Sequence, residues 1–448
     1  MRPDRVLDAD CGNPVGGNSS LHPERGGSIQ RALGDNPHNA VVHVFPTPDA
    51  GRAGPLSGVP VAIKDLIDVA GAPTRCGSAV LADAPPAGHD AEVVARLRAA
   101  GAIVVAKTHT HEFGYGPSGD VAVQGPCRNP HDPQRIPGGS SSGSAALVAA
   151  GVVPLAVGTD TGGSGRIPAA LCGVVGLKPA RGALPMTGVF PLSETLDHLA
   201  LLGADVDIVS TAFGALTGCR IDPSAPIAGT VVGRPTDAYW RVHDPEIAAA
   251  VDRAADVLAA AGATVRELRL PEIGELAATY RVIVNAEAYT THRHWLDQRP
   301  GDYQPFTATR LQAAGAYTAT DYIGAQRTRR RLSAELIARL DAQRVDVLLV
   351  PTTPVRATPI GARRVRAPDG TQVEVLRALL SLTLPFNLLG WPAVSVPAAQ
   401  LTGLPAGIQL AAVRGGEQLV LATAARLTAL RSGGPVLDTP APDRRRPR

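Results

Sequence analysis

Two Gly-Gly-Ser units, ending at Ser140 and Ser164, are the segments of this sequence best suited to covalent chemistry. They lie 24 residues apart. Paired glycines let a backbone adopt positive φ and approach a ligand closely, and successive N–H groups can point at a developing oxyanion. A serine directly after such a pair is well placed as a nucleophile, although one unit alone also fits a flexible loop.

A phosphate-binding loop is the first alternative for these glycine-rich segments. Such a loop follows a strand with the pattern Gly-x-x-x-x-Gly-Lys-Ser/Thr, whereas residues 137–168 contain no lysine. The nucleophile hypothesis has its own requirement, because a serine hydroxyl is a poor nucleophile until another group takes its proton. A base must therefore come from elsewhere in the chain.

Lys64 is the candidate base, since it ends the apolar segment 58–63. A lysine at the end of an apolar strand is desolvated, which favours its neutral form and lowers its pKa toward neutral pH. A lysine in such a place is more often a salt-bridged structural residue. Its combination with the two serine units favours the catalytic interpretation.

The segment His109-Thr110-His111-Glu112 suggests a metal site as a second alternative, because it follows a strand expected at 103–106. Alternate strand residues point the same way, so both rings could reach one ion. The simpler interpretation is a polar loop beside a pocket. It is favoured because other histidines do not follow strand-like segments, namely His198, His243, His292 and His294.

The composition is that of a folded protein, and the small net charge does not indicate a strongly charged binding partner. Hydrophobic residues make up 44% of the chain and charged residues 19%, and 448 residues are enough to bury a deep pocket. The formal net charge is only +3, and part of it comes from arginines in the segment 444–448. We therefore expect no nucleic-acid binding.

The cysteines and the N-terminus predict a cytoplasmic protein without a membrane span. The five cysteines are an odd number with no Cys-x-x-Cys pair, which favours free thiols in a reducing compartment. The first residues lack the apolar core of a signal peptide. The longest apolar stretch, 145–158, contains Gly151 and Pro154 and is too short to cross a bilayer.

Short β-branched segments alternate with amphipathic segments along the chain, which predicts an α/β fold. We expect a loose leader over 1–38, one large domain over 39–435 and a disordered basic tail over 436–448. Strands are expected at 59–64, 103–106, 264–268, 345–350, 393–396 and 406–410, and helices at 91–100 after an Asp90 cap, 245–261 after an Asp244 cap, and 326–342.

Three of these segments together resemble the signature of the amidase signature enzymes. They are the strand ending in Lys64, the Pro-Gly-Gly-Ser-Ser block at 137–141, and the Asp-Thr-Gly-Gly-Ser-x-Arg-x-Pro-Ala block at 160–169. The resemblance extends over about residues 40–430. Further segments match it in order, at 171–179, 196–197, 346–354, 386–392 and 404–410.

The resemblance implies a fold and a catalytic triad. The fold would be a large mixed, mainly parallel β-sheet covered on both faces by α-helices. Ser164 would be the nucleophile, and Lys64 would be the general base. Ser140 would be the bridging serine, in a cis peptide after Gly139.

The resemblance also implies an oxyanion hole and substrate contacts. Backbone N–H groups of Thr161, Gly162 and Gly163, with Ser164 itself, would stabilise the oxyanion. His111 and Tyr115 are predicted to contact the substrate. No metal ion and no cofactor are expected.

The predicted activity is hydrolysis of a small-molecule carboxylic acid amide to an acid and ammonia or an amine, through a serine acyl-enzyme. One alternative is the glutaminase (A) subunit of a tRNA-dependent amidotransferase, which shares the triad. Another is a hydrolase of urea-derived acids of the allophanate or carboxybiuret type, because Ser142 and Gly165 depart from the common signature.

The front of the chain also departs from the family pattern. Residues 45–48 lead almost directly to Gly58, where the family has a further helix. This shortening puts in doubt the contacts of a homodimer and argues against the docking surface of an amidotransferase partner. A binding protein without activity is disfavoured by the three intact triad residues.

Overall fold

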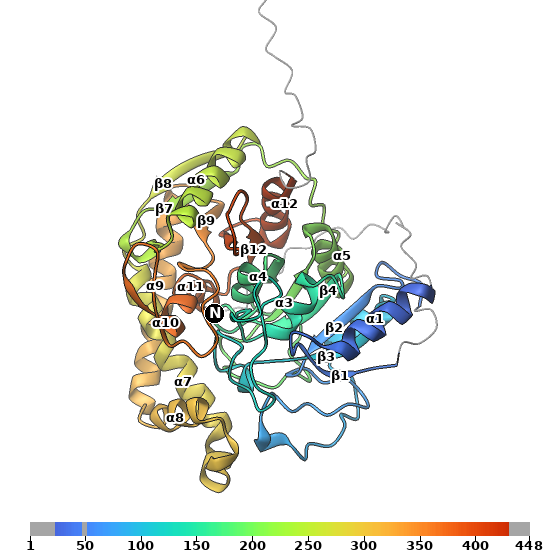
Figure 1. Cartoon of the computed structure of the whole chain (residues 1–448). Helices are drawn as coiled ribbons and strands as arrows, with labels where there is room; N and C mark the ends of the chain where they lie inside the picture. The colour runs from blue at the N-terminus through green and yellow to red at the C-terminus, as the bar shows by residue number, and fades with distance from the viewer. Residues whose placement is uncertain (1–22, 47–51, 430–448) are drawn as a thin grey trace, which may run out of the picture.

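The computed structural model describes residues 23–46 and 52–429 (Figure 1). Its centre is an eleven-stranded sheet with the strand order β1-β3-β2-β4-β6-β5-β12-β13-β9-β7-β8. The strands of this sheet are β1 (Val41–Val44), β2 (Pro60–Lys64), β3 (Ile103–Thr108), β4 (Leu155–Thr159), β5 (Val175–Lys178), β6 (Leu199–Gly203), β7 (Val231–Pro235), β8 (Thr264–Leu268), β9 (Val347–Pro351), β12 (Ala393–Pro397) and β13 (Gly407–Ala412). A separate pair joins β10 (Arg364–Arg366) to β11 (Gln372–Glu374).

The sheet is mixed, as predicted, and its parallel pairings lie in the two flanks. In one flank β3, β2 and β4 are parallel, and in the other β9, β7 and β8 are parallel. From β4 through β6, β5, β12 and β13 to β9 every pairing is antiparallel. The prediction of mainly parallel pairing thus applies to these two flanks. In the middle, two of the antiparallel pairs, β5–β6 and β12–β13, join strands that follow each other in sequence.

Helices cover both faces of the sheet. They are α1 (Pro23–Asp35), α2 (Glu92–Ala99), α3 (Ser142–Ala149), α4 (Arg166–Cys172), α5 (Val206–Thr217), α6 (Pro245–Ala260), α7 (Ile273–Gln298), α8 (Pro305–Ala314), α9 (Ala319–Ala342), α10 (Val375–Ser381), α11 (Leu384–Leu389) and α12 (Gly416–Thr428). Side chains of α2, α5, α6 and α12 share one hydrophobic core, whereas those of α3 and α4 belong to another.

The alternating direction of side chains along each strand explains why helices cover both faces of the sheet. In β2, Val61 and Ile63 belong to the first of these cores, and Ala62 between them belongs to the second. Successive strand residues point to opposite faces, so a strand that is apolar throughout must be covered on both sides. The prediction of an α/β fold with helices on both faces is confirmed.

Three predicted element boundaries were wrong. Residues 23–35 of the expected loose leader form α1, whose Leu33 is buried. Helix α9 begins at Ala319 rather than 326, because Thr318 and Asp321 form a capping box there. The cap of α2 is Ala91, since the Asp90 carboxylate instead accepts a hydrogen bond from the Ala70 N–H.

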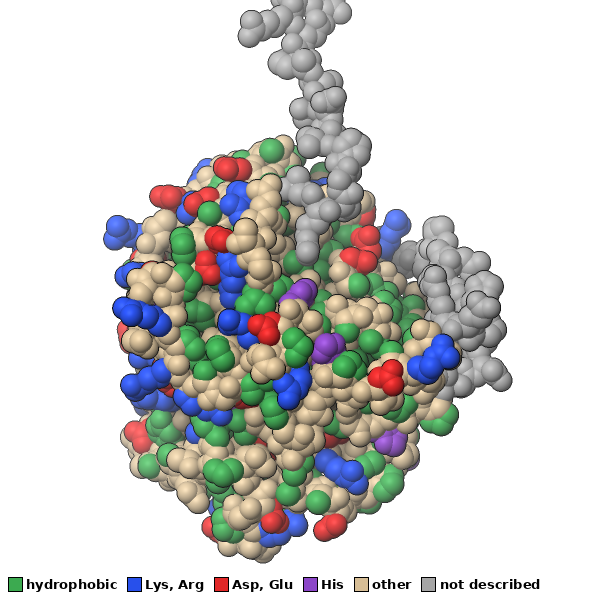
Figure 2. All heavy atoms as spheres, viewed as in Figure 1, with side chains coloured by type: hydrophobic (Ala, Val, Ile, Leu, Met, Phe, Trp, Pro, Cys, Tyr) green, Lys and Arg blue, Asp and Glu red, His purple; other side chains and the backbone are tan. Residues whose placement is uncertain are grey.

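Residues 1–22 of the expected leader and all of the expected tail lie outside the described residues. No helix in the described ranges is both long and apolar enough to span a membrane. On the face shown in Figure 2, the acidic and basic side chains of the described residues are interspersed. The four described cysteines are free, as predicted.

Candidate active site

Lys64 is the last residue of β2, and its side chain is fully buried. Its Nζ donates a hydrogen bond to Ser140 Oγ at 2.7 Å and another to Thr159 Oγ1 at 2.7 Å. Thr159 ends β4, the parallel neighbour of β2. The carboxyl ends of two parallel strands therefore place the amine and the first hydroxyl that holds it.

Burial determines the charge state of this amine. It lowers the pKa of Lys64 from 10.5 to about 7, although the negative charges of Asp160 and Asp197 act in the opposite direction. No carboxylate within the described residues forms an ion pair with Lys64, in contrast to the salt-bridged alternative considered from the sequence. At neutral pH a large share of the Lys64 amines is uncharged.

Ser140 lies in a tightly packed turn directly before α3. The Gly139–Ser140 peptide is cis, as the resemblance implied. A Cβ on Gly138 would lie 2.9 Å from Pro168 Cα, and one on Gly139 would lie 2.8 Å from the backbone nitrogen of Gly119. The two glycines are therefore required by close backbone packing, and they do not form a loose loop.

Ser164 lies in the turn that joins β4 to α4. Its carbonyl accepts a hydrogen bond from the Ser141 N–H at 3.2 Å, which holds the two Gly-Gly-Ser units side by side. It lines a narrow cavity of about 20 Å³ together with Gly114, and a Cβ on Gly114 would lie 3.5 Å from Ser140 Oγ. Within the described residues the Ser164 hydroxyl has no hydrogen-bond partner.

A buried ion pair holds the turn that carries Ser164. The Asp160 carboxylate accepts hydrogen bonds from the Gly165 N–H at 3.1 Å and from Arg166 Nε at 3.0 Å. Burial alone would raise the pKa of Asp160, but the charge and hydrogen bonds of Arg166 lower it overall. The Arg166 guanidinium, fully buried, also reaches the Thr383 carbonyl, Gln409 and Asn387.

The backbone N–H groups of residues 161–164 find no acceptor among the described residues. They belong to Thr161, Gly162, Gly163 and Ser164. Buried N–H groups are nearly always paired, so four successive donors without an acceptor, the last of them that of Ser164 itself, are unusual. Gly163 has φ of +135°, a conformation that favours glycine.

The two predicted substrate contacts occupy different places. Tyr115 lines the Ser164 cavity, and its hydroxyl donates to Asn285 Oδ1. His111 is not among the lining residues. Its Nδ1 accepts a hydrogen bond from the Gly119 N–H at 3.2 Å, and its Nε2 lies against Gly116.

The histidines of the metal alternative are held by other contacts. His109 Nδ1 lies 2.9 Å from Ser142 Oγ, its Nε2 lies 2.8 Å from the Gly125 carbonyl, and burial lowers its pKa to about 4. The Glu112 carboxylate accepts from Ser78. In the described part of the chain, no group of three or more His, Cys, Asp or Glu is arranged to hold a metal ion.

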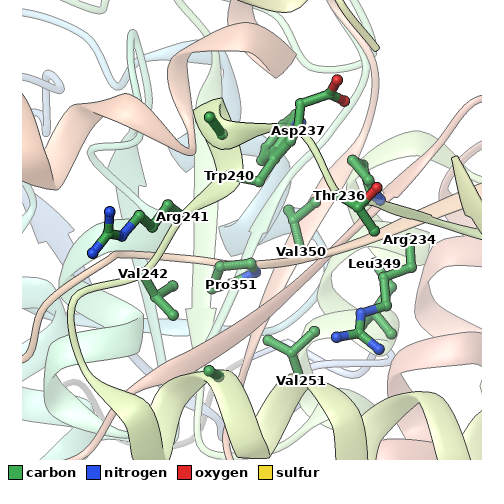
Figure 3. Close-up of a pocket in the computed structure, with 13 residues that line it drawn as sticks. Arg234, Thr236, Asp237, Trp240, Arg241, Val242, Val251, Leu349, Val350 and Pro351 are labelled. Carbon is green, nitrogen blue, oxygen red and sulfur yellow. The ribbon is translucent and has the colours of Figure 1, made fainter. Parts of the chain in front are cut away.

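A larger cavity, of about 500 Å³, lies where β7 and β9 end, and Figure 3 shows its lining. Its wall includes Arg234, Trp240 and Val251. None of the residues that the sequence predicts for catalysis or binding lines it.

Several residues of the Ser164 site were missed by the sequence analysis. Thr159 directly precedes the block at 160–169, and its hydroxyl holds Lys64. The others come from distant segments without a motif of their own, namely Tyr280 and Leu380 in the cavity wall and Thr383 against the turn.

A protein-family model described as Amidase matches residues 46–421. The chain belongs to the amidase family. Among its relatives is AtzE, the 1-carboxybiuret hydrolase subunit of Pseudomonas sp. (strain ADP), 38% identical over 384 residues that cover 82% of this chain and 82% of the relative. As an amidase, the protein is an enzyme that hydrolyses amides.

This amidase is also similar to an amidotransferase subunit and to a solved amidase structure. The glutamyl-tRNA(Gln) amidotransferase A subunit of Symbiobacterium thermophilum is 37% identical over 397 residues, covering 80% of this chain and 79% of the relative. A crystal structure described as that of an amidase matches with a TM-score of 0.82 and 35% identity, covering 91% of this chain and 95% of that chain.

Proposed function

We propose that this amidase cleaves a carboxylic acid amide through an acyl-enzyme on Ser164, with Lys64 as general base and Ser140 as the proton relay. The observation that carries the proposal is the 2.7 Å contact between Lys64 Nζ and Ser140 Oγ, made by a fully buried amine. A neutral lysine accepts a proton, whereas a charged one cannot. Burial supplies the neutral form.

The proposed steps extend the Lys64–Ser140 contact to Ser164. Ser164 Oγ adds to the amide carbon as its proton passes to Ser140 Oγ, while the Ser140 proton passes to Lys64 Nζ. The resulting ammonium returns a proton through Ser140 to the leaving nitrogen, the C–N bond breaks, and ammonia or an amine departs. Water then hydrolyses the ester on Ser164 by the same relay in reverse.

The unpaired N–H groups of residues 161–164 complete the proposal. The oxygen of the tetrahedral intermediate carries a negative charge, and donors already in place stabilise it without reorganisation. Each donor of this kind contributes about 3 kcal/mol to lowering the barrier. We assign Thr161, Gly162 and Gly163, with Ser164, to this oxyanion hole.

An amide panel scored by ammonia release tests the proposed reaction. The purified chain is incubated with aliphatic and aromatic amides, with glutamine and with urea-derived acids, and then with a fluorophosphonate. We expect release of ammonia from at least one amide and a single covalent label on Ser164. Label on another residue, or activity that survives full labelling of Ser164, would contradict the assignment.

Within the amides, we propose an anionic substrate of the urea-derived acid type. Arg310 lines the cavity that contains Ser164, and its guanidinium lies 3.8 Å from the centre of the Tyr115 ring. It forms no ion pair within the described residues, although it donates to the Tyr115 carbonyl. A cation in the cavity without a carboxylate partner suits a substrate carboxylate. The 1-carboxybiuret hydrolase relative is named for such an acid.

Replacement of Arg310 with glutamine should separate anionic from neutral substrates. We expect KM for a carboxylate-bearing amide to rise about 10- to 100-fold, because a hydrogen bond to a charged group contributes about 1.5–3 kcal/mol. A neutral amide of the same size should be affected less than about threefold, by the same reasoning. Steady-state kinetics with both substrates measure the difference.

Arg363→Gln is the matched control for this prediction. Arg363 lies 4.8 Å from the centre of the Phe306 ring and pairs with Asp120, but it does not line the Ser164 cavity. Its loss should leave the ratio of the two substrates unchanged. An equal loss for both substrates in Arg310→Gln would exclude a carboxylate-binding role.

The second candidate function is that of the glutaminase component of a tRNA-dependent amidotransferase, favoured by the 37% identity to such a protein. The amide panel distinguishes the two functions. Ammonia release from urea-derived acids by the isolated chain supports the hydrolase. Activity restricted to glutamine, and only with a partner protein, supports the amidotransferase.

A further inference from the structure

We propose that Thr383 and Asn387 are positioning residues that aim the oxyanion-hole N–H groups. The proposal rests on the function proposed above, because it assigns the aiming of that same hole. Both residues are fully buried and come from the segment around α11, more than 200 residues after the turn in sequence. Neither lines the Ser164 cavity.

The two side chains bind alternate carbonyls of the turn. Thr383 Oγ1 donates to the Gly162 carbonyl at 2.6 Å, and Asn387 Nδ2 donates to the Asp160 carbonyl at 2.8 Å. Thr383 is the residue before α11, and Asn387 lies four residues later. Residues at this spacing lie on one face of a helix. One face of α11 therefore holds the back of the turn.

The direction of each N–H follows from the peptide plane. The C=O and N–H of a trans peptide point to opposite sides, and the one cis peptide in the described residues is Gly139–Ser140. With the Gly162 carbonyl held by Thr383, the Gly163 N–H points away from Thr383. With the Asp160 carbonyl held by Asn387, the Thr161 N–H points away from α11. The N–H groups of Gly163 and Thr161 are two of the four unpaired donors of residues 161–164.

Close packing prevents the turn from avoiding these contacts. A Cβ on Gly163 would lie 2.2 Å from Thr383 Oγ1, so the backbone is in contact with the hydroxyl. Arg166 braces the same arrangement, since its Nη1 donates to the Thr383 carbonyl at 3.0 Å and its Nη2 to Asn387 Oδ1 at 2.7 Å. The Gly162 carbonyl thus cannot rotate without breaking the Thr383 contact.

The test compares Thr383→Val and Thr383→Ala, which remove the hydroxyl, with Thr383→Ser, which keeps it. We expect kcat to fall about 10- to 100-fold in Thr383→Val and Thr383→Ala, with KM changed less than about twofold, because the hole acts on the transition state. Thr383→Ser should keep kcat within about threefold. Each rate is divided by the amount of serine that the fluorophosphonate labels. Misfolded protein is therefore not counted as enzyme in kcat.

A second readout separates aiming from general destabilisation. A boronic acid that forms a tetrahedral adduct on Ser164 should lose affinity in Thr383→Val by the same factor as kcat/KM, while the carboxylic acid product should bind as before. Equal losses for both ligands, or equal kcat in the valine and serine variants, would overturn the proposal. An active wild type with inactive Ser164→Ala would leave the proposed function intact in that case.

Discussion

Ser164→Ala is expected to lower kcat for amide hydrolysis at least about 1,000-fold, which corresponds to about 4 kcal/mol of activation free energy. In the proposed mechanism this hydroxyl forms the acyl bond, and the Ser140 hydroxyl cannot replace it, since it is already held by Lys64 at 2.7 Å. Ammonia release at saturating substrate measures the loss. Fluorophosphonate labelling, followed by intact mass, should fall to zero in the same variant.

Ser144→Ala is the matched control. Ser144 is also buried and lies in α3, shortly after the first Gly-Gly-Ser unit, but its hydroxyl contacts Thr108 Oγ1 at 2.9 Å and the Val157 carbonyl at 3.2 Å. Removing this hydroxyl should lower the free energy of unfolding by about 1 kcal/mol for each hydrogen bond lost. It should leave kcat near the wild-type value. If Ser164→Ala kept wild-type turnover, the acyl-enzyme route would be excluded.

Lys64→Met is expected to lower kcat/KM by about 100- to 10,000-fold, the usual contribution of a general base. Methionine keeps a long apolar side chain in the buried space and removes only the amine. The wild-type pH profile carries the same information. Because burial lowers the pKa of Lys64 to about 7, the neutral fraction, and with it kcat/KM, should increase with pH through 7 and level off above it.

Lys178→Met provides the control for loss of a buried amine. Lys178 is as buried as Lys64, and its Nζ donates to the Pro179 and Trp391 carbonyls rather than to a serine. This variant should lose stability but retain most of its turnover per labelled serine, with an unchanged pH profile. A Lys64→Met variant that kept the increase in activity near pH 7 would show that another group is the base.

The cis peptide before Ser140 and the contact between Lys64 and Ser140 were predictable because they are set by short, unusual segments. Each of the Lys64, Ser140 and Ser164 segments has glycines or apolar residues that fit few structures, and together they carried the resemblance from which the cis peptide and the lysine-serine contact followed. The helical N-terminal region was not predictable in this way. Gly26 and Gly27 within α1 disfavour a helix locally, and Leu33 is buried only in the folded chain.

The wall of the site was beyond reach of the sequence for a different reason. Tyr280, Leu380 and Thr383 lie on segments whose local pattern shows only a helix or a helix end. Their importance comes from contacts across the fold, such as the Thr383 hydroxyl on the Gly162 carbonyl. The strand pairing in the middle of the sheet was also not predictable. The alternation of side chains along a strand does not determine which strand pairs with it, or whether the pair is parallel or antiparallel.

The hydrogen bonds of Arg166 make the active site depend on a strand that is distant in sequence. Its guanidinium donates to Gln409 Oε1 at 2.6 Å, across 243 residues of chain, while the adjacent turn carries Ser164. Deleting β13 would leave a permanent positive charge in the interior with one hydrogen bond missing, a costly state. We therefore expect C-terminal truncations that reach β13 to inactivate the enzyme, although all three residues of the proposed triad lie in the first 164 positions. A cut in a surface loop that leaves both pieces associated would spare it.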